Sequence, residues 1–250
     1  MLADPFFYAL AVPAIVLLGL SKGGFAGVGA ISMPLIALAV SPVQGAAIVL
    51  PILIVQDFVG VWAFRRDWDR RILAIMIPGA TVGILGGYLL AAEVSATAVL
   101  GVLGVISILF AVHRLWLDYV GKVTTSSDSP ASVGFFLGIA SGFTSQIAHA
   151  GAPPFQMWVL PKRLAPATLI GTTAIFFAIV NWLKVVPYAA LGQFTRENLL
   201  TALVLMPVAI ASTFAGVWLV KRISPKRFYT VIYILMIAVG AQLIWEAASG

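Results

Sequence analysis

The sequence predicts an all-α integral membrane protein, duplicated as a repeat in inverted topology, and three observations support this. Hydrophobic residues make up 61% of the 250 positions and charged residues only 10%, whereas a soluble domain carries roughly 25% charged residues. Long apolar segments recur along the whole chain. Basic residues gather in the short stretches between those segments. We therefore expect a single transmembrane domain over residues 1–250.

Six apolar segments can each cross a bilayer once as a helix, because about 20 residues span the hydrocarbon. They lie at about residues 43–64, 71–91, 95–117, 167–187, 198–220 and 228–247. No polar stretch between them is long enough to form a separate soluble domain. The sequence thus predicts six full spans.

Two further apolar regions are interrupted by polar residues and helix breakers. Segments 5–20 and 25–40 flank Ser21-Lys22-Gly23-Gly24, and region 131–160 contains the polar run 141–146 and the breaker run 149–154. Glycine, proline and a charged residue are poor choices inside a lipid-facing helix. Each region is either a re-entrant hairpin or two short spans, and the glycine-rich centres favour the hairpin. The expected total is eight to ten membrane segments.

Basic residues set the expected orientation, because loops rich in lysine and arginine stay in the cytoplasm. Twelve of the fifteen basic residues fall in four loops. They are Arg65, Arg66, Arg70 and Arg71; Arg114 and Lys122; Lys162 and Arg163; and Lys221, Arg222, Lys226 and Arg227. With all four loops in the cytoplasm, the span count places both termini on the extracytoplasmic side.

The two halves of the chain share an order of landmarks. Residues 19–34 align with residues 138–153 without a gap. The matched pairs are Gly23 with Gly142, Asp57 with Asn181, Pro78 with Pro207 and Gly87 with Gly216. Each half holds one broken pair and three spans, an odd number of crossings, so the second half is inserted upside down. We expect repeat 1 at 5–117, a linker at 118–130 and repeat 2 at 131–247.

The two interruptions are the candidate substrate-binding site. An anion that crosses hydrocarbon needs a replacement for its water shell, and backbone N–H groups at half-helix N-termini supply dipoles of the right sign. Lys22 adds a positive charge, although its side chain could instead snorkel to an interface. His149 could bind the anion, sense pH, carry a proton or only pack between helices. The candidates are Ser21, Lys22, Gly23, Gly24, Thr144, Ser145, Gln146, His149 and Gly151.

Three polar residues inside full spans are candidates for gating or coupling. Asp57 could accept hydrogen bonds near the substrate or answer a nearby base, and Asn181 offers a neutral amide for which packing is the expected role. We expect Lys184 to reach the outer headgroups, with an outer vestibule charge that attracts anions as the alternative. Asp57 and Lys184 are expected to lie too far apart to pair directly.

Several other classes of function are disfavoured. The chain has no cysteine, which excludes disulfides and thiolate metal ligands, and we expect no metal and no cofactor. A Walker-type glycine loop and a His-Glu-x-x-His motif are both missing from the sequence, so we expect neither ATP hydrolysis nor an intramembrane enzyme. The basic residues serve as topology signals, and binding of nucleic acid is not expected.

Three sequence motifs identify a family. They are Gly19-Leu20-Ser21-Lys22-Gly23-Gly24-Phe25 with Met33-Pro34-Leu35, Gly142-Phe143-Thr144-Ser145 with His149-Ala150-Gly151-Ala152-Pro153-Pro154, and Gly171-Thr172-Thr173 with Asn181-Trp182-Leu183-Lys184-Val185-Val186-Pro187-Tyr188. Together they resemble the TauE/SafE family of sulfite exporters, also called sulfonate and organosulfur permeases, over nearly the whole chain. Ala152 departs from the resemblance, because family sequences often carry a second glycine at this point.

The resemblance implies a multi-pass transporter of the cell inner membrane. Its partners would be the lipid bilayer and a small sulfur-containing anion such as sulfite or an organosulfonate, exported by alternating access around a midplane site. A passive anion channel and an ion-coupled importer of a related anion stay open as alternatives. A homodimer would stiffen such a scaffold, although no residue pattern marks an interface.

Overall fold

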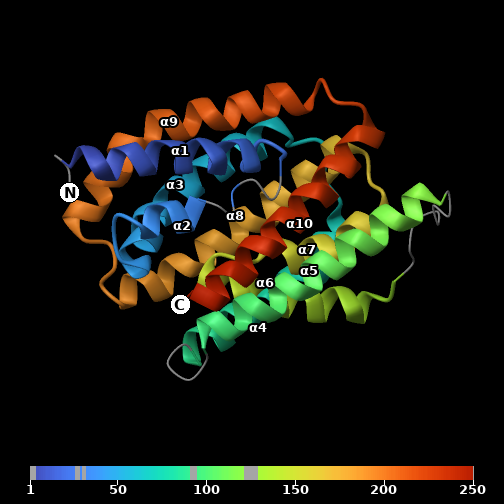
Figure 1. Ribbon diagram of the computed structural model, residues 1–250, viewed down its shortest axis with the longest axis horizontal. Helices are drawn as coiled ribbons and strands as arrows, with labels where there is room; N and C mark the ends of the chain where they lie inside the picture. Colours follow the sequence, from blue (N-terminus) through green and yellow to red (C-terminus); the bar gives the residue numbers. More distant parts are fainter. Residues whose placement is uncertain (1–3, 26–28, 30–31, 91–94, 121–128, 250) are drawn as a thin grey trace.

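The computed structural model describes residues 4–25, 29, 32–90, 95–120 and 129–249. Across these ranges the chain forms ten α-helices and one 3-10 helix, without a strand (Figure 1). The helices are α1 (Pro5–Lys22), α2 (Ser32–Ala37), α3 (Pro42–Ala63), α4 (Arg70–Leu89), α5 (Ala96–Tyr119), α6 (Ala131–Ala148), α7 (Ala152–Val159), η2 (Leu160–Lys162), α8 (Pro166–Ala190), α9 (Arg196–Val220) and α10 (Pro225–Ser249). Most of the predicted linker, together with positions 26–28 and 30–31 of the first interrupted region, lies outside the described residues.

Each of the six predicted spans is confirmed as a helix long and apolar enough to cross a membrane. They are α3, α4, α5, α8, α9 and α10. By the same measure α1 is a seventh candidate among the described residues, because the helix predicted over 5–20 continues through Ser21 and Lys22 and reaches 18 residues. Helix α6 is also 18 residues long, and over Ala131–Ile147 it is an apolar helix slightly shorter than the seven candidate spans.

Several helix starts follow from local sequence. Asp4, Ser41, Asp69, Ser95 and Thr195 each stand just before a helix and accept a hydrogen bond from a backbone N–H in its first turn. These N-terminal N–H groups have no partner within the helix, so a capping side chain stabilises the end by about 1 kcal/mol.

Helices that are distant in sequence pack against one another. Helix α1 lies along α9, and α6 lies along α4. Helix α3 contacts both α8 and α9, α8 also contacts α4, and α5 pairs with α10. Figure 1 shows α8 passing through the middle of the bundle, with α1 and α9 on one side and α4, α5 and α6 on the other. Polar groups on α8 can therefore meet both sides.

Small residues bring these helix pairs into backbone contact. A Cβ atom on Gly23 would lie 2.6 Å from the Cα atom of Gly216 in α9, and a Cβ atom on Gly142 would overlap the carbonyl oxygen of Ala80 in α4. Glycine at such positions lets two membrane helices approach closely, which strengthens packing where no water is available to drive association.

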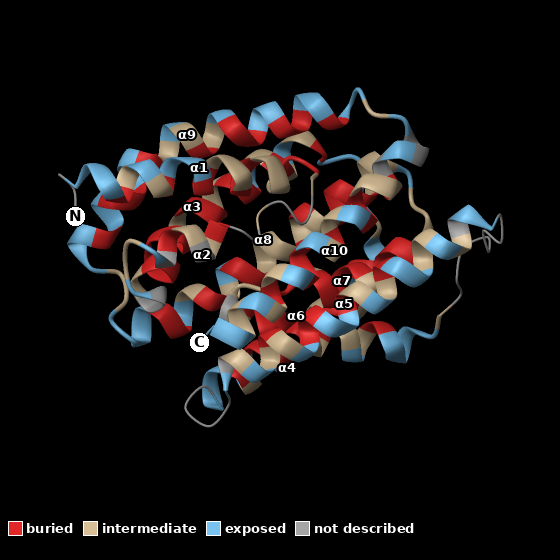
Figure 2. Ribbon diagram, in the orientation of Figure 1, coloured by how far each residue is buried: buried red, intermediate tan, exposed pale blue. Residues whose placement is uncertain are grey.

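The outer surface of the bundle is apolar. Figure 2 shows that the helices turn their buried faces inward and their exposed faces outward. Large exposed side chains include Leu109, Phe136, Leu203 and Trp245, each more than 60% accessible. Such a surface suits hydrocarbon and not water, because soluble proteins rarely expose large contiguous apolar patches. The described part of the chain is therefore a multi-pass membrane protein.

The two predicted interruptions differ in detail. In the first, α1 ends at Lys22 and Gly24 adopts a φ of +137°, which glycine tolerates best. In the second, the helix was expected to be disturbed from residue 141 onward. Instead α6 stays helical to Ala148, and the break falls at His149, whose φ of 52° is left-handed.

Candidate functional site

Helix α8 supplies a stripe of polar and aromatic side chains at the centre of the bundle. Thr173, Phe177, Asn181, Lys184 and Tyr188 are spaced by three or four residues, so they share one face of the helix. All but Tyr188 line a cavity that also reaches the ends of α1 and α6. Asn181 and Lys184 are 2% and 1% exposed, so their polar groups need partners inside the protein.

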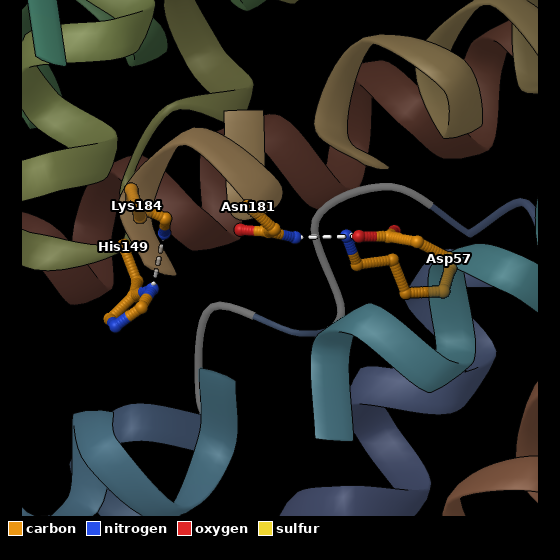
Figure 3. A network of polar contacts seen from close by, with 5 residues as sticks. Asp57, His149, Asn181 and Lys184 are labelled. Carbon is orange, nitrogen blue, oxygen red and sulfur yellow. Dashed lines mark hydrogen bonds and ion pairs between the residues drawn. The ribbon is translucent and has the colours of Figure 1, made fainter. Parts of the chain in front are cut away.

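The first polar cluster joins α1, α3 and α8. The Lys22 Nζ atom lies 2.6 Å from Oδ1 of Asp57, and the Asn181 amide donates to Oδ2 of the same carboxylate over 2.6 Å (Figure 3). Asp57 is 1% exposed and Lys22 16%. A buried carboxylate is tolerated only when it is paired and hydrogen-bonded. Both oxygens of Asp57 meet that requirement.

The second polar cluster joins α8 to the break after α6. The Lys184 Nζ atom lies 3.0 Å from Nδ1 of His149 (Figure 3). It also lies 3.4 Å from the carbonyl oxygen of Ser145. The Tyr188 hydroxyl lies 3.1 Å from Nε2 of the same imidazole. If Lys184 donates to Nδ1, a neutral His149 carries its hydrogen on Nε2 and donates to Tyr188. Both ring nitrogens are thus engaged.

A cavity of about 160 Å³ lies between the two clusters. Its polar lining includes Ser21, Lys22, Ser145, His149, Gln156, Thr173, Asn181 and Lys184. One buried water needs roughly 10–15 Å³ of free space, so a small oxyanion and several waters would fit. The lining continues along α10 to Glu246, whose carboxylate accepts a hydrogen bond from Gln242.

Two hydroxyl groups hold the second break in shape. The Thr144 hydroxyl lies 3.0 Å from the carbonyl oxygen of Ala150 and 2.8 Å from that of Ala140, so its one hydrogen is shared between them. Ser141 donates to the carbonyl oxygen of Gly151 over 2.6 Å. Carbonyl groups just beyond a helix end have no partner in the helix, and a buried one is costly if left alone. These bonds fix the backbone beside His149.

Most of the predicted substrate-binding residues gather at the cavity. Ser21, Lys22, Gly24, Ser145 and His149 line it. Four candidates have other surroundings.

Gly23 packs on Gly216, and Gly151 packs beside Ser145 and Phe177. Thr144 uses its hydroxyl within the break. The Gln146 side chain lies against Gly87 of α4, on a different face of α6 from the cavity-lining Ser145.

The expected position of Lys184 is wrong. Lys184 does not reach the outer headgroups, because it is 1% exposed and contacts His149. Lys22 lines the cavity and pairs with Asp57, which disagrees with the alternative that it snorkels to an interface. Asp57 does answer a nearby base, as one interpretation of the sequence held, and Asn181 contributes a hydrogen bond where packing alone was expected.

Phe177 and Tyr188 belong to the site but carry no role in the sequence-based prediction. The Phe177 ring centroid lies 5.3 Å from Nζ of Lys22, within reach of a cation–π interaction. Tyr188 meets His149. The signal that could have found them is their helical spacing from Asn181 and Lys184 on the same face of α8.

Among the residues that the structure describes, no group of three or more His, Cys, Asp or Glu side chains could hold a metal ion. Lys22 instead pairs with Asp57, and Lys184 contacts His149. The amines of Lys22 and Lys184 line the cavity at this end, and the buried Asp57 carboxylate pairs with Lys22 from outside the lining. The arrangement suits a small anion that can exchange water for hydrogen-bond donors.

The fold and the polar clusters define a polytopic α-helical membrane protein with an internal cavity between two interrupted regions. The sequence matches the family model described as "Sulfite exporter TauE/SafE" over residues 11–243. The chain therefore belongs to the TauE/SafE family of membrane transport proteins, which confirms the resemblance drawn from the three motifs. A comparison with curated proteins and one with solved structures each gave no match.

Proposed function

We propose that the protein exports a small sulfur-containing anion, sulfite or an organosulfonate, from the central cavity by alternating access. The observation that carries the proposal is the presence of two lysines at one cavity: Lys22, at the first interrupted region, and Lys184 of α8, which contacts His149 of the second. Membership of the TauE/SafE family supports the sulfur anion as substrate. The transporter would lie in the cell membrane with both termini outside.

The lysines are positioned to replace water around an anion. An ammonium group has three donors. Lys22 uses one toward Asp57, and Lys184 directs its own toward His149 and the Ser145 carbonyl. Each amine is thereby fixed in place, and the remaining capacity of Lys22 and the hydroxyl of Ser21 face the cavity. Charged donors fixed in advance stabilise a dehydrated anion without reorganising the protein.

An inverted repeat provides the moving parts in this proposal. The packing of α1 on α9 is mirrored by that of α6 on α4, as a twofold relation between the halves requires. Asp57 and Asn181, matched by the sequence alignment, bond to each other where α3 meets α8. A pseudo-twofold axis between them would bring equivalent residues together in this way. Rocking of one half against the other would open the cavity to each side in turn.

The membrane potential favours export of an anion. An inside-negative potential assists exit by about 2.3 kcal/mol per charge for each 100 mV. A coupling ion is therefore unnecessary for export. Uptake against the same potential would need one.

A flux assay in proteoliposomes tests the substrate. We expect saturable, counterflow-competent transport of sulfite or an organosulfonate when sulfite, sulfate, thiosulfate, sulfoacetate and taurine are compared under imposed voltage and pH gradients. If none of the sulfur compounds is transported, the proposed function is refuted. A large single-channel conductance would indicate a channel and not a carrier.

Substitution at Lys22 tests the site. Lys22→Gln/Asp57→Asn removes the ion pair without leaving a lone buried charge. We expect it to weaken sulfite binding by about tenfold or more, because a hydrogen bond to a charged group contributes about 1.5–3 kcal/mol. Arg71→Gln, at an exposed position outside the cavity, is the matched control and should bind sulfite as the wild type does. Equal affinity in the double variant would remove Lys22 from the site.

A further inference from the structure

A second groove lies at the ends of α3 and α9, apart from the central cavity. Its described lining comprises Trp62, Ala63 and Arg65 from the end of α3 and Phe214, Val217, Trp218 and Lys221 from the end of α9. It shares no lining residue with the central cavity. The transport proposal leaves this groove without a role.

The walls of the groove are aromatic and open to the surroundings. Trp62, Trp218 and Phe214 are 61%, 56% and 44% exposed. The Trp62 and Phe214 rings meet edge to face with centroids 6.3 Å apart, and Val217 is buried beneath them. Tryptophan prefers the level of the lipid headgroups, since it offers an apolar ring and one polar N–H. The walls therefore suit the glycerol and upper acyl region of a lipid.

The mouth of the groove is basic. The Arg65 guanidinium lies 5.5 Å from the Trp62 ring and donates one hydrogen bond to the Trp62 carbonyl oxygen. The Lys221 Nζ atom lies 5.7 Å from the centroid of the Phe64 ring, and the Arg222 guanidinium lies 3.9 Å from the centroid of the Trp218 ring. Arginine has five N–H donors and lysine three, so the single recorded bond of Arg65 leaves donors for a ligand.

Negative charge is not built into the groove itself. Its described lining holds two basic side chains and no carboxylate. Asp67 and Asp69 follow Arg65 along the chain, but neither lines the groove. The loops that carry Arg65 and Lys221 are also the ones that charge distribution assigns to the cytoplasm, where the leaflet holds anionic lipids.

We propose that this groove binds an anionic phospholipid. Its phosphate would lie between Arg65 and Lys221, and its glycerol and acyl chains would follow Trp62, Phe214 and Trp218. Basic pockets between membrane helices at the cytoplasmic side commonly hold such headgroups. The lipid would bridge α3 and α9, which come from different halves of the chain and contact each other directly.

Lipid titration of the purified protein in detergent, read by native mass spectrometry, tests the site. Phosphatidylglycerol and phosphatidylcholine with identical acyl chains are compared. We expect the wild type to prefer phosphatidylglycerol, and Arg65→Gln/Lys221→Gln to lower that affinity by about fivefold per charge removed. Binding of phosphatidylcholine should not change.

Two further variants separate the groove from general surface charge. Arg66→Gln/Arg71→Gln removes two exposed charges of the same neighbourhood that do not line the groove, and we expect the preference to persist. Arg65→Lys/Lys221→Arg retains the charge and should also keep the preference. This result would show that changing these two side chains does not by itself unfold the protein.

Three results would overturn the proposal. One is an undiminished preference in Arg65→Gln/Lys221→Gln. Another is an equal loss in the Arg66→Gln/Arg71→Gln control, which would indicate diffuse electrostatics. The third is displacement of phosphatidylglycerol by soluble glycerol 3-phosphate at the same concentration, because the aromatic walls would then contribute nothing. None of these results depends on which solute the central cavity transports.

Discussion

Lys22 and Lys184 are buried by different means. Lys22 contacts the carboxylate of Asp57. Lys184 contacts the imidazole of His149 and the carbonyl oxygen of Ser145. Removing a charge from water is costly unless a partner of good geometry replaces the water. Lys22 donates to one oxygen of the Asp57 carboxylate and Asn181 to the other, so both oxygens have a partner.

Removing the acid alone should harm the protein more than removing the pair. Asp57→Asn leaves the mostly buried Lys22 amine without its counter-ion, and we expect a loss of roughly 3 kcal/mol, or about 5–10 °C in Tm. Lys22→Gln/Asp57→Asn should recover part of that loss in thermal unfolding in detergent. The exposed Asp67→Asn serves as control. A double variant less stable than the single one would argue against the pair as the cause.

His149 has a backbone requirement as well as a side-chain role. Its φ of 52° lies in the left-handed region, which asparagine tolerates and alanine does not. Both His149→Asn and His149→Ala lose the bonds to Lys184 and Tyr188, so we expect reduced sulfite flux in both. His149→Ala should be less stable than His149→Asn by about 1 kcal/mol. Equal unfolding temperatures of the two variants would show that the left-handed backbone conformation does not limit the stability.

At the scale of elements, the contact between α4 and α6 depends on glycines that face the neighbour. A Cβ atom on Gly83 would overlap the carbonyl oxygen of Ile139, whereas a Cβ atom on Gly86, one turn away on α4, would meet nothing within 4 Å. The same helix therefore offers a position that cannot accept a methyl group and one that can.

This difference predicts opposite effects of the same substitution. Gly83→Ala should lower the stability by roughly 1–3 kcal/mol, because overlap with a neighbouring backbone forces the helices apart. Gly86→Ala should be neutral or stabilising by up to about 1 kcal/mol, since alanine is the better helix former. Thermal unfolding of the two variants in one detergent compares them. Similar losses in both would mean that helix contact does not set the tolerance.

At the scale of the whole molecule, the orientation in the membrane is open to a direct test. The chain contains no cysteine, so single cysteines can be introduced without a background. Asp67 lies between α3 and α4, and Leu191 follows α8. Both are exposed.

The predicted topology places these two positions on opposite sides. With the basic loops in the cytoplasm, Asp67→Cys should react with an impermeant maleimide only after the cells are opened, and Leu191→Cys should react in intact cells. Wild-type protein gives the blank. Labelling of both positions from one side would overturn the predicted topology.

The sequence determined the properties that depend on local composition. Hydropathy placed the six confirmed spans, because about 20 apolar residues suffice to cross hydrocarbon wherever they pack. Glycine and proline located the two interruptions, although α1 continues through Ser21 and Lys22 and α6 continues to Ala148. The three motifs identified the family that the comparison confirmed.

Only the tertiary structure decided which polar side chains meet. Lys184 turns to His149 and Lys22 to Asp57, while Gln146 turns to α4. These choices depend on how each helix is rotated about its axis, and that rotation is set by close contact at glycines between helices that are far apart in sequence, such as α4 with α6 and α1 with α9. Spacing along one helix predicts a shared face, but it does not reveal which neighbour that face will meet.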